Sequence, residues 1–171
     1  MVYGIIKATF LNLFRRHISL HPVQNFEHGV RMKIRGNGRL FIGKGCHILR
    51  NSTLFADEGI IRIGNGVFIN ENVKIVAHDE IVIGDRCSIG PNVMVFDHDH
   101  DYRKESGFKS DKIIIGEGAW IGANVVILKG CKIGKNAVIA AGSVIYEDIG
   151  DKCVIYQKRV DVVKKYSEGI N

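Results

Sequence analysis

Proline and long apolar runs are scarce in this chain of 171 residues, which contains only 2 Pro. No stretch reaches the roughly 18–20 consecutive apolar residues that a membrane-spanning helix requires, so we expect no transmembrane span. The apolar stretch near the N-terminus is interrupted by charge and lacks a small-residue cleavage site, which argues against a signal peptide. Aromatic residues amount to 8% and the positive charges are scattered. The sequence therefore lacks the interleaved basic and aromatic residues of nucleic-acid-binding surfaces, and we expect no nucleic-acid partner.

What the sequence does have is a fixed period of six residues. Neither an α-helix nor a strand has that period, whereas fixed internal periodicity indicates a solenoid. Shorter series keep the same step from Ile42 to Leu54, from Ile63 to Ile81 and from Ile83 to Val95. The longest unbroken series of aliphatic residues is Ile115, Ile121, Ile127, Ile133, Ile139 and Ile145.

The residue three places after each aliphatic position is usually Gly, Asn or Asp. These residues adopt positive φ at low cost, so each hexad predicts a short strand followed by a turn with one left-handed residue. Arg86 is the exception. The twelve positions are Gly45, Asn51, Asp57, Gly66, Asn72, Arg86, Asn92, Gly118, Asn124, Gly130, Asn136 and Gly142.

Three hexads predict one coil of 18 residues with three flat faces, in which successive coils pair as parallel strands around a column of Ile and Val. Two-residue slips such as Ile81 to Ile83 fit small corner insertions. The six-residue period is interrupted between residues 97 and 112, and this polar segment predicts a loop that leaves the coil. At 171 residues we expect one domain.

The four cysteines fall in a small inward position, four places after an aliphatic residue. We interpret Cys46, Cys87, Cys131 and Cys153 as buried structural thiols rather than disulfide partners or metal ligands. Free buried thiols favour a reducing compartment, and we expect a cytoplasmic protein.

Through these hexads the chain resembles the hexapeptide-repeat acyltransferases, in particular the galactoside, maltose and polysaccharide O-acetyltransferase branch. The run IGEGAWIGANVVILKGCKIGKNAVIAAGSVI carries the likeness, which extends over about residues 36–156. The resemblance implies an all-β fold, a left-handed parallel β-helix. We divide the chain into an N-terminal cap at 1–20, the β-helix at 21–156 with its loop at 97–112, and a basic tail at 157–171.

The two ends of the chain follow a different pattern from the repeat. Residues 3–18 space their apolar residues three or four apart, which predicts a short amphipathic helix. This helix could cap the open end of the solenoid or lie on a membrane surface, and both interpretations stay open. The tail contains Lys158, Arg159, Lys164 and Lys165 and predicts a short helix or a solvated charge cluster.

The segment FDHDHDYR, at Phe96–Arg103, stands where the repeat lapses. A neutral imidazole can accept the proton of a hydroxyl that attacks a thioester, and a carboxylate on its other nitrogen would fix its tautomer. In the resembling family the catalytic His lies seven residues after the motif IGPNV, which selects His100 here. His98 lies two residues earlier and remains an alternative, because Asp101 replaces the family's usual Pro.

Other site residues are implied by the resemblance. Asn70 matches an active-site Asn, and Trp120 matches a Trp that flanks the cofactor near the catalytic His. Ala123 and Ala141 match positions whose backbone groups bind pantetheine amides. The net charge of +6 fits an anionic cofactor such as acetyl-CoA, with Lys158 and Arg159 as candidate contacts and no metal expected.

The resemblance also implies a homotrimer with each active site in the groove between two subunits. The function we expect is coenzyme A-dependent acetyl transfer to a hydroxyl of a sugar or polysaccharide precursor. Two alternatives are a zinc lyase of the carbonic anhydrase type, in which His78, His98 and His100 approach one metal, and a non-catalytic solenoid.

Overall fold

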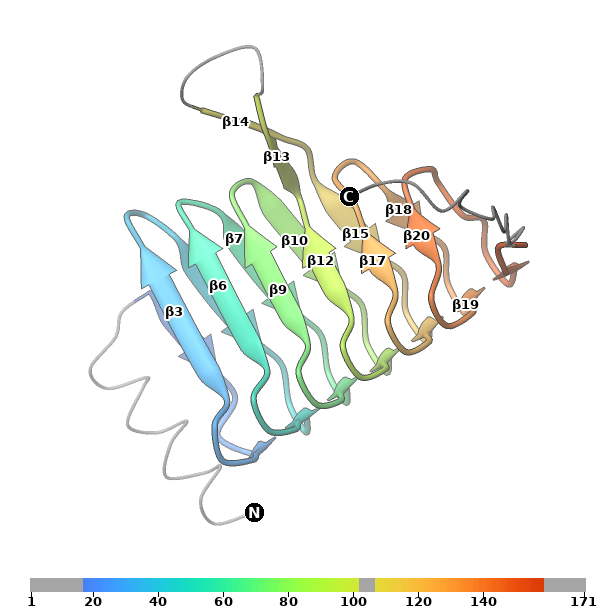
Figure 1. Ribbon diagram of the computed structural model, residues 1–171. Helices are drawn as coiled ribbons and strands as arrows, with labels where there is room; N and C mark the ends of the chain where they lie inside the picture. Colours follow the sequence, from blue (N-terminus) through green and yellow to red (C-terminus); the bar gives the residue numbers. More distant parts are fainter. Residues whose placement is uncertain (1–16, 102–106, 159–171) are drawn as a thin grey trace, which may run out of the picture.

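The computed structural model describes residues 17–101 and 107–158, which form a parallel β-solenoid of about six turns (Figure 1). Within these ranges the chain forms strands and turns but no α-helix. The predicted helix at 3–18 lies outside the described residues except for its last two positions, and there Ile18 already begins a strand. The tail from Arg159 onward also lies outside them.

Three sheets form the flat faces of the solenoid, numbered here in the order in which the chain visits them. Face 1 contains β1 (Ile18–Leu20), β4 (Arg39–Ile42), β7 (Ile60–Ile63), β10 (Glu80–Ile83), β15 (Ile113–Ile115) and β18 (Lys132–Ile133). Face 2 contains β2 (Asn25–Phe26), β5 (His47–Ile48), β8 (Phe68–Ile69), β11 (Ser88–Ile89), β16 (Trp120–Ile121), β19 (Val138–Ile139) and β21 (Val154–Ile155). Face 3 contains β3 (Arg31–Arg35), β6 (Thr53–Asp57), β9 (Lys74–Ala77), β12 (Met94–Phe96), β17 (Val126–Ile127) and β20 (Val144–Ile145).

The coils vary in length more than a strict 18-residue repeat predicts. Leu40 pairs with Ile61, 21 residues later, and Ile61 pairs with Ile81, 20 residues later. The 18-residue spacing occurs between Ile115 and Ile133. The extra residues of the earlier coils lie mainly at the edge between face 3 and face 1, which we call the 3–1 edge.

The core is the predicted column of aliphatic side chains, one from each face of each coil. Its members are almost fully buried, and they include Ile48, Ile69, Ile89, Ile121 and Ile139 on face 2. Glycines after these residues let successive coils approach closely. At Gly122, for instance, a Cβ would lie only 2.6 Å from the backbone nitrogen of Ala141.

The left-handed turn positions agree with the sequence at eleven of the twelve predicted residues, Arg86 included, since φ is positive at each. At the remaining position Glu58, rather than Asp57, takes the positive φ of 61°. Asp57 instead ends β6 with its side chain buried. An insertion at the 3–1 edge moves the turn by one residue there.

The cysteines are free thiols, but their burial differs. Cys46, Cys87 and Cys131 are buried as predicted, and burial raises the pKa of each thiol. The prediction was wrong for Cys153, which is exposed. Cys153 lies in the last coil that the structure describes, at the end of the buried column.

The interruption of the repeat is a hairpin rather than an unstructured loop. β13 (His98–His100) pairs antiparallel with β14 (Phe108–Ser110), and the hairpin projects from the 3–1 edge (Figure 1). Its base is closed by a hydrogen bond from the Asp111 amide to the Asp97 carbonyl, 2.8 Å long. Ile81 and Ile113 still pair across the insertion, 32 residues apart.

In the described ranges, no helix long and apolar enough to cross a membrane is present.

Arg86 tests the rule that the third residue after each aliphatic position adopts positive φ and therefore favours Gly, Asn or Asp. Its left-handed backbone costs an L-residue about 1–2 kcal/mol, a cost that Asn bears more easily. Its exposed guanidinium pairs with Glu117, and an exposed ion pair contributes only about 0.2–1 kcal/mol. We expect Arg86→Asn to raise the free energy of unfolding by up to about 1 kcal/mol in urea titrations. The control is Asn136→Arg, which should lower it, because Asn136 occupies the same turn position at this edge. Stabilisation by the second change would contradict the rule.

Candidate active site

Two groups of predicted site residues lie at different places on the solenoid. Asn70, Trp120, Ala123 and Ala141 line a groove on face 2 and at the edge where face 2 meets face 3. His98 and His100 lie on the hairpin at the 3–1 edge. The width of face 3 separates these edges, roughly 16 Å for five extended residues at about 3.3 Å each. One subunit alone therefore does not bring the two groups together.

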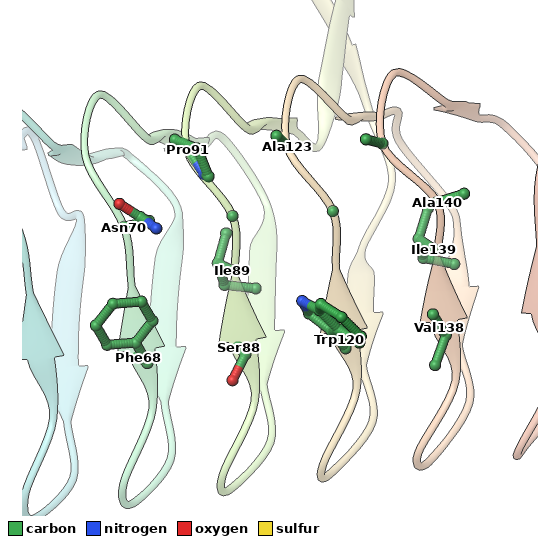
Figure 2. Close-up of a pocket in the computed structure, with 13 residues that line it drawn as sticks. Phe68, Asn70, Ser88, Ile89, Pro91, Trp120, Ala123, Val138, Ile139 and Ala140 are labelled. Carbon is green, nitrogen blue, oxygen red and sulfur yellow. The ribbon is translucent and has the colours of Figure 1, made fainter.

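The groove has a volume of about 550 Å³ and spans four successive coils (Figure 2). Two rows of outward positions form it, and neighbouring strands hold these rows in register. Its lining consists of Phe68, Asn70, Ser88, Ile89, Gly90, Pro91, Trp120, Gly122, Ala123, Val138, Ile139, Ala140 and Ala141.

The first row explains the depth of the groove. Phe68, Ser88 and Trp120 occupy paired positions on three neighbouring strands. The small Ser88 therefore lies between two aromatic rings, which form the walls of a slot (Figure 2). Trp120 is 60% exposed. An exposed indole at the wall of a groove is typical of a surface that a ligand covers.

The second row is nearly bare backbone. Asn70, Gly90 and Gly122 follow their strands in neighbouring coils, and Ala140 continues the row. With so few side chains, an extended ligand can lie directly along the edges of the coils. The Asn70 side-chain oxygen accepts a hydrogen bond from the Glu71 amide at 2.8 Å, so the group that Asn70 can offer to a ligand is its amide NH₂.

At the 3–1 edge, His98 is held by a buried carboxylate. Asp97 is fully buried, and its Oδ1 lies 3.1 Å from His98 Nδ1. The same carboxylate accepts hydrogen bonds from the backbone amides of His78 and Asp79, both at 2.8 Å. Because a carboxylate only accepts, Nδ1 of neutral His98 carries the proton. Nε2 then bears the lone pair that a general base requires.

His78 packs directly beside His98. Their ring centroids are 3.9 Å apart. On its other side, His78 Nε2 lies 3.3 Å from a carboxylate oxygen of Asp57, which also pairs with the Arg35 guanidinium. Burial, and secondarily the neighbouring His98, lower the pKa of His78, while Asp57 and Asp97 act in the opposite direction.

His100 lies in a different environment. It is exposed on the hairpin, and its ring lies 4.8 Å from that of Phe108. Phe108 also contacts His78 and His98, at 4.2 and 5.3 Å between ring centroids. Around Phe108 the structure thus gathers three histidines, of which His78 and His98 each have a carboxylate beside a ring nitrogen.

The sequence predicted a carboxylate partner for the catalytic histidine but did not select Asp97 as that partner, and it gave no role in the site to Asp57 or Phe108. The signal for Asp97 was its place at the last position before the repeat lapses, where a side chain still faces inward. Asp57 looked like a turn residue, and only its burial distinguishes it. Lys158 is exposed beyond β21 and does not line the groove, and Arg159 lies outside the described residues.

The repeat that builds this geometry matches a known protein family over part of the chain. Residues 112–147 match the family described as bacterial transferase hexapeptide (six repeats). A galactoside O-acetyltransferase of Lactococcus lactis is 34% identical over 133 residues, which cover 74% of this chain and 63% of that enzyme. This chain therefore contains, at residues 112–147, the repeat of the bacterial hexapeptide transferase family. It spans less than two thirds of the length of this Lactococcus relative.

Two further similarities concern the same family of hexapeptide-repeat proteins. The galactoside O-acetyltransferase of Escherichia coli is 43% identical over 93 residues, 52% of this chain and 46% of that enzyme. A hexapeptide-repeat-containing acetyltransferase of Vibrio cholerae, solved in complex with acetyl coenzyme A, superposes with a TM-score of 0.58. It is 26% identical, and the match covers 86% of this chain and 71% of that chain.

The zinc arrangement considered from the sequence is not seen in this hexapeptide-repeat chain. Across residues 17–101 and 107–158, no group of three or more His, Cys, Asp or Glu side chains is placed to hold a metal ion. His78 and His98 stack on each other, while His100 lies against Phe108.

The environment of His78 predicts how stability depends on pH. Because burial lowers its pKa in the folded state, the unfolded chain binds the proton more tightly, with a pKa of about 6.5. This contribution to stability is therefore lost as the pH falls below that value towards the lowered folded pKa. We expect His78→Gln to lose less stability than wild type between pH 7.5 and 5.5, measured by urea unfolding. The control His28→Gln, at an exposed histidine, should keep the wild-type slope, and an unchanged slope in His78→Gln would contradict the assignment.

Proposed function

We propose that this chain is an O-acetyltransferase that moves the acetyl group of acetyl-CoA to a hydroxyl of a sugar or polysaccharide precursor. The observation that carries the proposal is the face-2 groove, with Trp120 at its wall and nearly bare backbone along its floor. Its shape suits an extended, amide-containing arm such as pantetheine. The acetyl-CoA complex of the Vibrio cholerae relative supports the donor, and the two galactoside O-acetyltransferases support a sugar acceptor.

In the proposed reaction, the acceptor oxygen attacks the thioester carbonyl carbon while its proton passes to Nε2 of His98. The C–S bond then breaks, and the coenzyme A thiolate takes the proton back from the imidazolium. Asp97 supports this step, because its carboxylate holds Nδ1 and stabilises the charge that forms on the ring. Backbone N–H groups would hold the oxyanion.

The choice of His98 over His100 follows from its partners. The spacing after IGPNV favoured His100, but the ring of His100 is exposed and lies against Phe108. His98 has both a buried carboxylate on Nδ1 and neighbours that restrict its ring. A base needs a fixed position and a fixed tautomer, and His98 meets both needs.

We propose that two subunits complete each site. In a trimer, the hairpin of one subunit would reach the face-2 groove of its neighbour and deliver His98 to the thioester. The separation of the two groups within one chain supports this arrangement. Asn70 would then donate its amide N–H to the acceptor or the thioester carbonyl, and Trp120, Ala123 and Ala141 would line the cofactor arm. Lys158 and Arg159 remain predicted phosphate contacts. Membrane contact through residues 3–18 also remains a prediction.

Substitution of each histidine tests the choice of base. We expect His98→Ala to lower kcat by about 10²–10⁴-fold, the usual contribution of a general base. His100→Ala should retain most of the activity. The measurement is thiol release from acetyl-CoA with a panel of galactosides and other sugars as acceptors. Loss of activity in His100→Ala with an active His98→Ala would reverse the assignment, and no thiol release by wild type with any acceptor would reject the proposed function.

Complementation tests the shared site. Ala123→Trp should fill the groove and block the cofactor while leaving the histidines intact. If each site combines the hairpin of one subunit with the groove of another, co-expression of Ala123→Trp with His98→Ala restores about a quarter of the sites at random assembly. The two variants expressed separately serve as controls. Failure of the mixture to exceed them, with mixed oligomers shown by tagged purification, would mean that each site belongs to one chain.

A further inference from the structure

A ladder of side chains runs along the 3–1 edge and ends at His98. Arg35 and Asp57 are paired positions on neighbouring strands of face 3. Ala56 pairs with Ala77, so His78 stands beside Asp57 in the next coil. Val76 pairs with Phe96, so His98 stands beside His78 in the coil after that. Four successive coils therefore contribute one side chain each to a single column.

The contacts along this column are continuous. The Arg35 guanidinium binds the Asp57 carboxylate through two nitrogens. Asp57 in turn lies 3.3 Å from His78 Nε2, and the His78 ring packs on His98 at 3.9 Å between centroids. Only the first side chain of the ladder is largely exposed, since Arg35 is 64% exposed while Asp57, His78 and His98 are 3%, 12% and 13% exposed.

We propose that the first three members of the ladder, Arg35, Asp57 and His78, position its last member, His98. His78 then acts on the reaction as a positioning residue without touching the substrate. This inference rests on the proposed function of His98 as the base. Asp57 fixes the plane and tautomer of the His78 ring by accepting its Nε2–H. The fixed ring supports one side of His98, while Asp97 holds Nδ1 of the same residue.

Burial, more than the surrounding charges, lowers the pKa of His78 and favours its neutral ring. Its neighbours are Asp57 and Arg35 from the two preceding coils, Asp97 and His98 from the next coil, and the uncharged Phe108 ring from the hairpin. During catalysis His98 accepts a proton, and a cation at His78 would repel it at this distance. A neutral His78 supports the ring of His98 without opposing its protonation.

The ladder restricts the orientation of the His98 ring in a way that Asp97 alone cannot. One contact to Nδ1 leaves the ring free to rotate about the axis of that contact. Packing against His78 on one side, with Phe108 at 5.3 Å, restricts this rotation. A displacement of about 1 Å in a reacting group can cost up to about a hundredfold in rate, so restriction of the base has measurable kinetic consequences.

Three variants test the ladder. We expect His78→Ala to lower kcat by about tenfold or more while the KM for acetyl-CoA changes little, because the face-2 groove is untouched. His78→Phe keeps a packing ring and should retain more activity than His78→Ala. Asp57→Asn should lower kcat by a smaller factor than His78→Ala. The control is His28→Ala, an exposed histidine in the first coil, with wild-type kinetics expected.

A second measurement does not depend on turnover. Long-range ¹H–¹⁵N spectra of wild type should show His98 protonated on Nδ1 beside Asp97. In His78→Ala the His98 ring signals should shift or broaden, because the ring keeps its tautomer but loses its fixed orientation, with His78→Phe between the two. Wild-type His98 ring signals and wild-type kcat in all His78 and Asp57 variants that fold would overturn the ladder. If wild type transfers no acetyl group to any acceptor, the proposed function fails, while the spectra still decide whether the ladder fixes His98. Should His78→Ala fail to fold, the comparison of His78→Phe with Asp57→Asn decides in its place.

Discussion

The structure depends on the stacking of one coil directly on the next. Backbone amides of each coil donate to carbonyl groups one residue before the equivalent position in a neighbouring coil, as in the 2.8 Å bonds from Gly90 to Ile121 and from Gly122 to Ile139. Such close stacking allows little between the coils except backbone, which is why glycine occupies both of these donor positions. Side chains are consequently aligned in columns, and each column keeps one environment through many coils.

Both parts of the candidate site are columns of this kind. The groove on face 2 combines a row that alternates aromatic and small side chains with a row of almost bare backbone. The ladder at the 3–1 edge carries a guanidinium, a carboxylate and two imidazoles in successive coils. The chain thus builds both columns from residues 18 to 32 positions apart in sequence, without any specialised loop for the groove.

The sequence predicted the fold well because a period of six is a local property. The aliphatic column, the left-handed turns and the inward Cys46, Cys87 and Cys131 could all be read from hexad positions. Asn70, Trp120, Ala123 and Ala141, which the likeness to a family selected, lie along one groove, and their roles there stay predictions. The ladder could not be found, because Asp57 and His78 interact across coils whose lengths differ by corner insertions. Cys153 was misassigned because hexad position does not tell whether a further coil covers a residue.

The hairpin between β12 and β15 leaves the solenoid and returns to it at almost one point, where the Asp111 amide meets the Asp97 carbonyl. The paired strands on both sides of it keep the register of the uninterrupted coils. The free energy of closing such an excursion rises only slowly with its length. Its tip can therefore change in size and composition while the column of Ile and Val stays as it is. In a solenoid of this design the hairpin and the buried column can therefore change in sequence independently of each other.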